Sequence, residues 1–342
     1  MTAVFCRNAA DRKAKTWEGQ LAPFDRLEFA ISDAAQGIAK AVSGLVRARC
    51  DDPEAPPLEH GLDVFHTTME ARRVLAQDWR RAEAAWEQAE AADGEVARSK
   101  HQGIDARGVA QTARVAWGRA NASFEHAERR EAAWGQAHAA LDLFRADGRL
   151  NDRAHAEAEI AEALKGLDGP DWSKVRNFLT DRRGLSFLDR MHRRLDWAEP
   201  DAGRREAMAW RWWLSHRRVA CPHPLMRLVR AVGRQCELSE SERASYDRVS
   251  AVLEDTFRAS SAVECMNSVM RMQQSRHKRM TQPMLDLKRL YWNCHEFRSG
   301  PRKQTCPYQG LGLDLPTYDF WKLLQTDPKR LTQRLSTARN AE

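Results

Sequence analysis

The sequence lacks any apolar run near the ~20 residues that a membrane-spanning helix needs. Its opening stretch, MTAVFCRNAADRKAK, has too few consecutive apolar residues for a signal peptide. Cysteine is sparse, and its seven residues follow no repeating spacing, which is typical of reduced thiols. The spacing of Cys294, His295 and Cys306 does not match a zinc site. We therefore expect a cytoplasmic protein without membrane spans, structural disulfides or zinc.

Negative charge is missing where positive charge is concentrated. Glu264 is the only acidic residue within residues 259–285. Residues 271–303 contain nine Lys or Arg residues and two acidic ones, a net charge of +7 that equals the net charge of the whole chain. A local block of this kind favours a surface that binds the phosphates of nucleic acid. The alternative is a solvated basic helix surface without a partner.

Residues 1–68 follow an α/β pattern. The segment RLEFAIS, residues 26–32, has the length of a buried strand, and a helical pattern resumes after Asp33. Strand, acidic residue and helix in this order predict a strand-to-helix junction. Asp33 has a simpler alternative role as a helix N-cap.

Residues 69–257 are helical by pattern. Trp and Ala recur at spacings of three to four residues on both sides of a turn at about residues 103–108, which predicts an antiparallel hairpin of two long helices. We assign the hairpin's tryptophans to the core. Further helices are predicted at about 152–166, 171–196, 203–219 and 239–257. Trp210, Trp212 and Trp213 are too close together to share one helix face, so one of them could stack on a base, although core packing is the alternative.

Residues 258–314 contain, at residues 260–280, the segment SSAVECMNSVMRMQQSRHKRM. As a helix, this segment places Glu264, Asn267 and Arg271 on one polar stripe beside an apolar stripe. Glu264 has an alternative role as a first-turn acid favoured by the helix dipole. A second helix is predicted over residues 285–297, a closing loop follows it, and residues 315–342 form a tail.

Three segments together resemble the DDE transposases of bacterial insertion sequences. SSAVE with Asn267, the helix YWNCHEF and the loop GPRKQTCPYQGLGL are similar to the C-terminal end of that family's catalytic domain. FAISDAAQGIAKAV resembles the junction that bears the second catalytic Asp, here Asp33. GLDVFHTTMEA resembles an Asp-x-Phe-His stretch that some of these families place next, here Asp63 and His66. The resemblance covers about residues 15–70 and 258–314, and the family often carries an insertion domain between them.

The resemblance implies a fold and a reaction. The fold would be an α/β, RNase H-like domain with an incomplete sheet, formed by residues 1–68 and 258–314, with a large all-α insertion at 69–257, so that the chain is predominantly α. The reaction would be DNA strand cleavage and transfer by two-metal phosphoryl transfer. Asp33 and Glu264 would be the catalytic ligands of Mg²⁺ (or Mn²⁺), because these hard cations prefer carboxylate oxygen.

The same resemblance implies partners and supporting residues. The residues expected to grip the DNA backbone are Arg271, Arg276, Lys278, Arg279, Arg302 and Lys303. His66 and Asn267 would support the site, although His66 could instead be a core histidine with satisfied hydrogen bonds. Duplex DNA at transposon ends, in the bacterial nucleoid, is the expected partner, and a homodimer is a second expectation.

The family's first catalytic acid has no counterpart in the pattern. Residues 1–10 contain no acidic residue, and Asp11 and Asp25 fall at helix and turn positions. We therefore expect an N-terminally truncated transposase that binds DNA without cleaving it. The alternative is a non-enzymatic helical protein for DNA binding or assembly.

Overall fold

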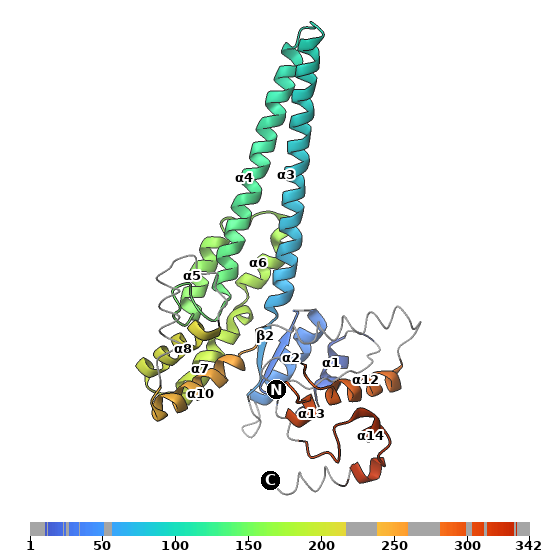
Figure 1. The fold of residues 1–342 in the computed structure, drawn as a ribbon, viewed down its shortest axis with the longest axis vertical. Helices are drawn as coiled ribbons and strands as arrows, with labels where there is room; N and C mark the ends of the chain where they lie inside the picture. Colours follow the sequence, from blue (N-terminus) through green and yellow to red (C-terminus); the bar gives the residue numbers. More distant parts are fainter. Residues whose placement is uncertain are drawn as a thin grey trace. The chain divides into compact units, whose positions relative to one another are not determined.

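The computed structural model describes most of the chain as two compact units. The described residues are 11, 13–22, 24, 27–33, 35–50, 57–216, 238–258, 281–298, 303–310, 313–331 and 333. One unit comprises Met1–Leu21 and Ser261–Glu342, and the other comprises Ala22–Ser260. Helices predominate in both units (Figure 1). Among the described residues, no helix is both long and apolar enough to cross a membrane.

The described elements of the smaller unit are helices, apart from one isolated β-bridge between Phe297 and Lys303. Its helices are α1 (Ala14–Leu21), α12 (Gln282–Cys294), α13 (Pro307–Gly310) and α14 (Phe320–Leu324). Tyr291 of α12 contacts Phe320 of α14 edge to face, with ring centroids 5.3 Å apart. Cys294 and Cys306 are buried, and burial raises the pKa of the Cys294 thiol to about 11. The helix predicted over residues 285–297 is thus present, but it begins and ends three residues earlier.

The larger unit opens with a β–α–β element: β1 (Phe29–Ser32), α2 (Gln36–Cys50) and β2 (Glu59–Leu62). The two strands are parallel and form the one sheet of the described residues, with Phe29 opposite Glu59 and Ser32 opposite Leu62. The sequence predicted β1 and α2, whereas β2 was not predicted. Its sequence, EHGL, has no run of apolar residues to mark it. Gly61 is required there, because a Cβ atom would lie 2.7 Å from the Phe29 ring.

Two long helices then form the predicted hairpin, α3 (Val64–His101) and α4 (Arg107–Ala140). They extend side by side beyond the other helices of this unit (Figure 1). Alanines line the seam between them, and all are buried: Ala82, Ala89, Ala113, Ala120 and Ala127. Small side chains let the two helices approach closely along this seam. The helix α3 begins at Val64 and so crosses the boundary that we drew at residue 69.

Shorter helices surround the base of the hairpin. They are α5 (Arg153–Ala163), the 3₁₀ helix η1 (Pro170–Trp172), α6 (Ser173–Thr180), the 3₁₀ helix η2 (Arg182–Leu185), α7 (Ser186–Ala198), α8 (Ala202–His216) and α10 (Glu240–Glu254). Their fully buried side chains, which include Trp172, Leu188 and Leu195, form one core with the base of α3 and α4. The single helix predicted over 171–196 is interrupted at Asp181, whose carboxylate caps η2 by accepting the Arg183 N–H.

The tryptophans divide between core and surface. Trp134 and Trp213 are 6% and 5% exposed, as expected for core residues. Trp86 and Trp210 are each 38% exposed. The assignment of all hairpin tryptophans to the core is therefore wrong for Trp86. Trp86 lies on the outer part of the hairpin, where, among the described residues, α3 and α4 pack only against each other through alanines. Two helices without a third element cannot enclose a large side chain.

Candidate functional site

The candidate site lies at the carboxyl edge of the parallel strands β1 and β2. Asp33 follows the last residue of β1 and Asp63 follows the last residue of β2. The Asp63 N–H donates to the Ser32 carbonyl oxygen at 2.9 Å, so the strand pairing continues to this edge. Carboxyl ends of parallel strands are where ligands bind in open α/β sheets. The β–α–β connection therefore brings the two acids predicted from the sequence to the same edge.

A cavity of about 570 Å³ opens beside this edge. Its walls come from the strand ends, the first turns of α3, and α6 with the residue that follows it. The charged and polar residues lining it are Asp33, Asp63, His66, Thr67, Glu70, Lys174, Asn177 and Asp181. Leu62, Val175 and Phe178 supply its apolar surface. Polar groups converging on a partly apolar cavity are typical of a binding site.

Asp63 and His66 form a fixed pair in the first turn of α3. The Asp63 side chain is fully buried, and one of its oxygens accepts the Phe65 N–H at 2.8 Å, so it is the N-cap of the helix. Its other oxygen lies 2.7 Å from Nδ1 of His66. The His66 side chain is 40% exposed at the cavity, so it is not a core histidine. The buried carboxylate orients the imidazole toward the cavity wall.

Asp33 is arranged differently from Asp63. It is exposed, and one carboxylate oxygen accepts the Ala35 N–H at 3.1 Å. This is an Asx turn ahead of α2, which begins at Gln36, so Asp33 directs the chain into the helix without being its N-cap. Among the described acids of the cavity, Asp33 is therefore the one best placed to take an additional ligand.

The other two cavity acids already have basic partners. Glu70 lies 3.0 Å from Arg73 and 3.5 Å from Lys174, and the hydrogen bond from Arg73 lowers the pKa of the Glu70 carboxyl. Asp181 is paired with Arg183 at 2.6 Å, and that hydrogen bond lowers the pKa of Asp181. Both acids are thus committed to ion pairs at the wall of the cavity.

A buried histidine supports the strands beneath the site. His60 on β2 lies 2.8 Å from the Ser32 hydroxyl through Nε2 and 3.4 Å from Arg183 through Nδ1. Burial, followed by the Arg183 charge, lowers the pKa of His60 to about 4, so the ring is neutral at pH 7. A guanidinium can only donate, so Nδ1 accepts and Nε2–H donates to Ser32. This chain of contacts ties β1 and β2 to the Asp181–Arg183 pair.

The described residues by themselves do not form a metal site. Within them, no group of three or more His, Cys, Asp or Glu side chains is arranged to hold an ion. Asp63 has both oxygens engaged, which leaves Asp33 as the open carboxylate. The predicted second ligand, Glu264, lies outside the described residues.

Most of the predicted DNA-binding residues also lie outside the described residues. This applies to Asn267, Arg271, Arg276, Lys278, Arg279 and Arg302. Lys303 is described: it is exposed, and it pairs with Phe297 in an isolated β-bridge of the smaller unit.

Sequence reasoning did not identify four of the residues around this site: His60, Glu70, Lys174 and Arg183. His60 sits on the strand that was not predicted. Lys174 and Arg183 come from a region more than 100 residues downstream, so no local pattern connects them with β2. Glu70 follows His66 by one helical turn, which is a signal that the sequence does contain.

Comparisons of the chain with family models, with curated proteins and with solved structures gave no match.

Proposed function

We propose that the chain is a DDE transposase-like protein that binds duplex DNA, with its ancestral catalytic centre at the carboxyl edge of β1 and β2. The observation that supports the proposal is the β–α–β arrangement at this edge. It places Asp33 and the Asp63–His66 pair beside one cavity, in the chain order of the motifs that resemble the transposases. If Asp33 and Asp63 had only structural roles, the fold would not need a cavity at the carboxyl edge of β1 and β2.

Each residue of the proposed centre has a physical role. Asp33 and Glu264 would hold Mg²⁺ or Mn²⁺, and these ions when bound activate the attacking oxygen and stabilise the leaving oxygen in phosphoryl transfer. Asp63 would keep His66 in one orientation at the cavity. Lys174 is 79% exposed and lines the same cavity, so its ammonium group can attract a DNA phosphate.

The basic block of residues 271–303 would bind the DNA backbone. Phosphate contacts depend on charge and reach, and each one lost reduces the salt dependence of binding by about one unit. We therefore expect the purified chain to bind duplex DNA with an affinity that falls steeply as salt rises. Neutralising Arg276, Lys278 and Arg279 to Gln should weaken binding and flatten the slope of log K against log salt by up to about 3 units.

A matched control replaces three other basic residues with Gln. Lys100, Arg119 and Arg204 are exposed residues of α3, α4 and α8, outside the basic block. Fluorescence anisotropy over a salt series compares the two triple variants. Equal slopes for both would show that binding depends on net charge alone and would contradict a dedicated DNA surface at residues 271–303.

A second candidate function is DNA binding or assembly without catalysis. The observation in its favour is that Asp63, Glu70 and Asp181 are each engaged with a basic side chain. The resemblance implies three metal-binding acids, and we assign two, which hold a metal pair poorly. We expect no cleavage in a nicking assay with Mg²⁺ or Mn²⁺. Cleavage that is lost in Asp33→Asn and in Glu264→Gln would contradict the truncation and would show that another acid completes the site.

A further inference from the structure

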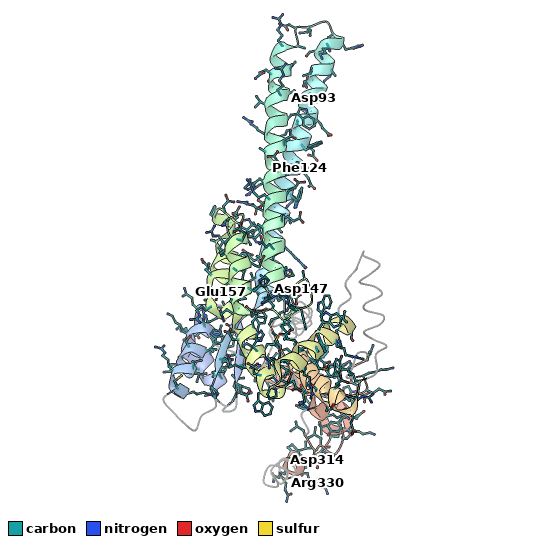
Figure 2. All side chains as sticks on the ribbon, turned by 90° about the vertical axis from the view of Figure 1, so that its left-hand side faces the viewer. Asp93, Phe124, Asp147, Glu157, Asp314 and Arg330 are labelled. Carbon is teal, nitrogen blue, oxygen red and sulfur yellow. The ribbon has the colours of Figure 1, made fainter. Side chains whose placement is uncertain are left out.

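One side of the α3–α4 hairpin carries a row of four aromatic side chains, Trp79, Trp86, Trp117 and Phe124, called here the aromatic row. The rings alternate between the two helices and meet edge to face. Their centroids are 5.7 Å apart for Trp79 and Phe124, 5.3 Å for Trp86 and Phe124, and 4.7 Å for Trp86 and Trp117. Figure 2 labels Phe124 on this part of the hairpin, with Asp93 nearer the tip.

Acidic residues hold the indole groups of the row in place. Each tryptophan donates its N–H to a carboxylate: Trp79 to Glu131 at 3.2 Å, Trp86 to Glu90 at 2.9 Å, and Trp117 to Asp93 at 2.7 Å. The row is therefore an ordered surface with defined ring positions, and its apolar faces are partly exposed. Ordered aromatic side chains lose little conformational entropy on binding and are enriched at protein interfaces.

The hairpin beneath the row is weakly supported by its own core. From residue 82 to residue 127 its buried side chains are alanines, which contribute little apolar area. Two helices in isolation gain most of their stability from packing an apolar face against another element. Among the described residues, α5, η1 and α6 pack near the base of the hairpin and leave its outer part without a third helix (Figure 1).

The outer parts of the two helices have opposite charges. Residues 82–97 of α3 contain five acidic residues and no basic one. Residues 107–124 of α4 contain three basic residues and no acidic one, and two of the three, Arg107 and Arg114, lie on the Trp117 side of the helix. Within these two segments, all of them described, no ion pair joins α3 to α4. Each hairpin thus presents one acidic helix and one basic helix beside the aromatic row.

We propose that this face binds a second copy of the chain. A two-fold axis parallel to the hairpin, with the aromatic rows facing each other, places α3 of one copy antiparallel to α4 of the other and at the same height. The acidic segment then lies against the partner's basic segment on both sides of the axis. A self-complementary surface of this kind is what a two-fold dimer requires, and the product is a four-helix bundle.

The available area agrees with a dimer of moderate affinity. About 20 residues of each helix extend beyond the base, a length of about 30 Å at 1.5 Å per residue. With a width of about two helix diameters, ~20 Å, the face offers about 600 Å² from each copy. The total of about 1,200 Å² is at the lower end of stable protein interfaces. The inference does not depend on the proposed DNA-binding function.

Glu90 and Arg114 provide the most specific test. Trp86 contacts Trp117, and both Glu90 and Arg114 lie about one helical turn from that contact toward the tip, because Glu90 follows Trp86 by four residues and Arg114 precedes Trp117 by three. In the proposed dimer, Glu90 of each copy approaches the partner's Arg114. Both residues are exposed, so their replacement should leave the fold intact. Glu90 also accepts the Trp86 N–H, and the control Glu90→Gln, whose amide oxygen can still accept it, separates the charge from this hydrogen bond.

Sedimentation velocity of the full chain over a range of concentrations measures the dimer. We expect Glu90→Arg and Arg114→Glu each to raise the dimer dissociation constant by about tenfold or more, because each places like charges together. The double variant Glu90→Arg/Arg114→Glu should restore dimerisation. Arg119→Glu, an exposed change two residues from Trp117 and thus on another side of α4, should have little effect.

Trp86→Ala should weaken the dimer without loss of helix content, as measured by circular dichroism. A monomer at all concentrations, or a dimer that neither single charge reversal weakens, would overturn the proposal. A double charge reversal that fails to restore dimerisation while helix content is unchanged would also overturn it, since it would show that α3 does not face the partner's α4.

Discussion

Asp33 and Asp63 occupy equivalent positions after neighbouring strands, yet their surroundings differ. Asp63 is fully buried, caps α3 and holds His66, whereas Asp33 is exposed and makes one hydrogen bond to the Ala35 amide. Asp63 therefore has a structural role in the site, whereas the carboxylate of Asp33 is accessible to a ligand. It also gives the two residues different effects on stability.

Asp63→Ala should lower the free energy of unfolding by about 1–2 kcal/mol, because the mutation removes a helix N-cap. Asp33→Ala should change it by less than about 0.5 kcal/mol, as is usual for an exposed residue. Urea unfolding of the two variants checks this. A loss for Asp33→Ala as large as that for Asp63→Ala would show that Asp33 is mainly structural.

His60 makes stability depend on pH. Its pKa is lowered from 6.5 to about 4 in the folded protein, so between these values the unfolded chain binds the proton and the folded chain does not. The contribution of His60 to stability is therefore fully present above pH 6.5, and it is lost progressively as pH decreases toward 4. The contribution of one proton to this slope is at most about 1.4 kcal/mol per pH unit.

His60→Gln should reduce that slope, since the amide can still donate to Ser32 and does not titrate. Unfolding free energies measured between pH 4 and 7 test the prediction. His101→Gln, in the exposed last turn of α3, is the control and should leave the slope unchanged. The pKa of the Asp181 carboxyl is lowered by Arg183, so this group affects stability at lower pH and does not explain a slope between pH 4 and 6.5. An unchanged slope in His60→Gln would contradict the buried neutral ring.

At the scale of elements, the alanine seam sets the distance between α3 and α4. Ala120 has no exposed surface, while Ala122 on the same helix is exposed. Ala120→Leu should destabilise the protein by about 1–3 kcal/mol because the added volume forces the helices apart. Ala122→Leu should have little effect. Thermal unfolding followed by circular dichroism compares the pair, and equal melting temperatures would contradict close packing along the seam.

The hairpin was predictable because Trp and Ala recur at three- to four-residue spacing on both sides of the turn. The strand β1 was predictable from its apolar run. The strand β2 was not, because its four residues, EHGL, are stabilised by a parallel partner and by Gly61 fitting against Phe29. The break at Asp181 was missed because no Pro marks it: Asp181 has an extended backbone after α6, and its carboxylate caps the start of η2.

The candidate site was predictable only in part. Asp33, Asp63 and His66 came from motifs along the chain, and the fold brings them beside one cavity. Lys174, Asp181 and Arg183 reach the same place through tertiary packing of α6 and η2, which the sequence does not show. Trp86 was misassigned because a helical period identifies a shared face without identifying what covers it.

For the whole molecule, the central claim is that two distant acids form one metal-binding centre. Asp33 belongs to the unit Ala22–Ser260 and Glu264 to the unit that contains Ser261–Glu342. The proposed function requires these two acids, which are far apart in the sequence, to share one metal ion when the chain binds DNA. The claim therefore concerns a distance between two named side chains.

The most direct measurement is a crystal structure of the full chain grown with Mn²⁺ and duplex DNA, in which anomalous scattering locates the metal. Carboxylates that share metal ions lie within about 4–8 Å of each other, given ligand distances near 2.1 Å. We predict that separation for Asp33 and Glu264, with Mn²⁺ between them. Well-ordered carboxylates more than about 12 Å apart would contradict the assignment of this pair, since no shared ion could then bind both.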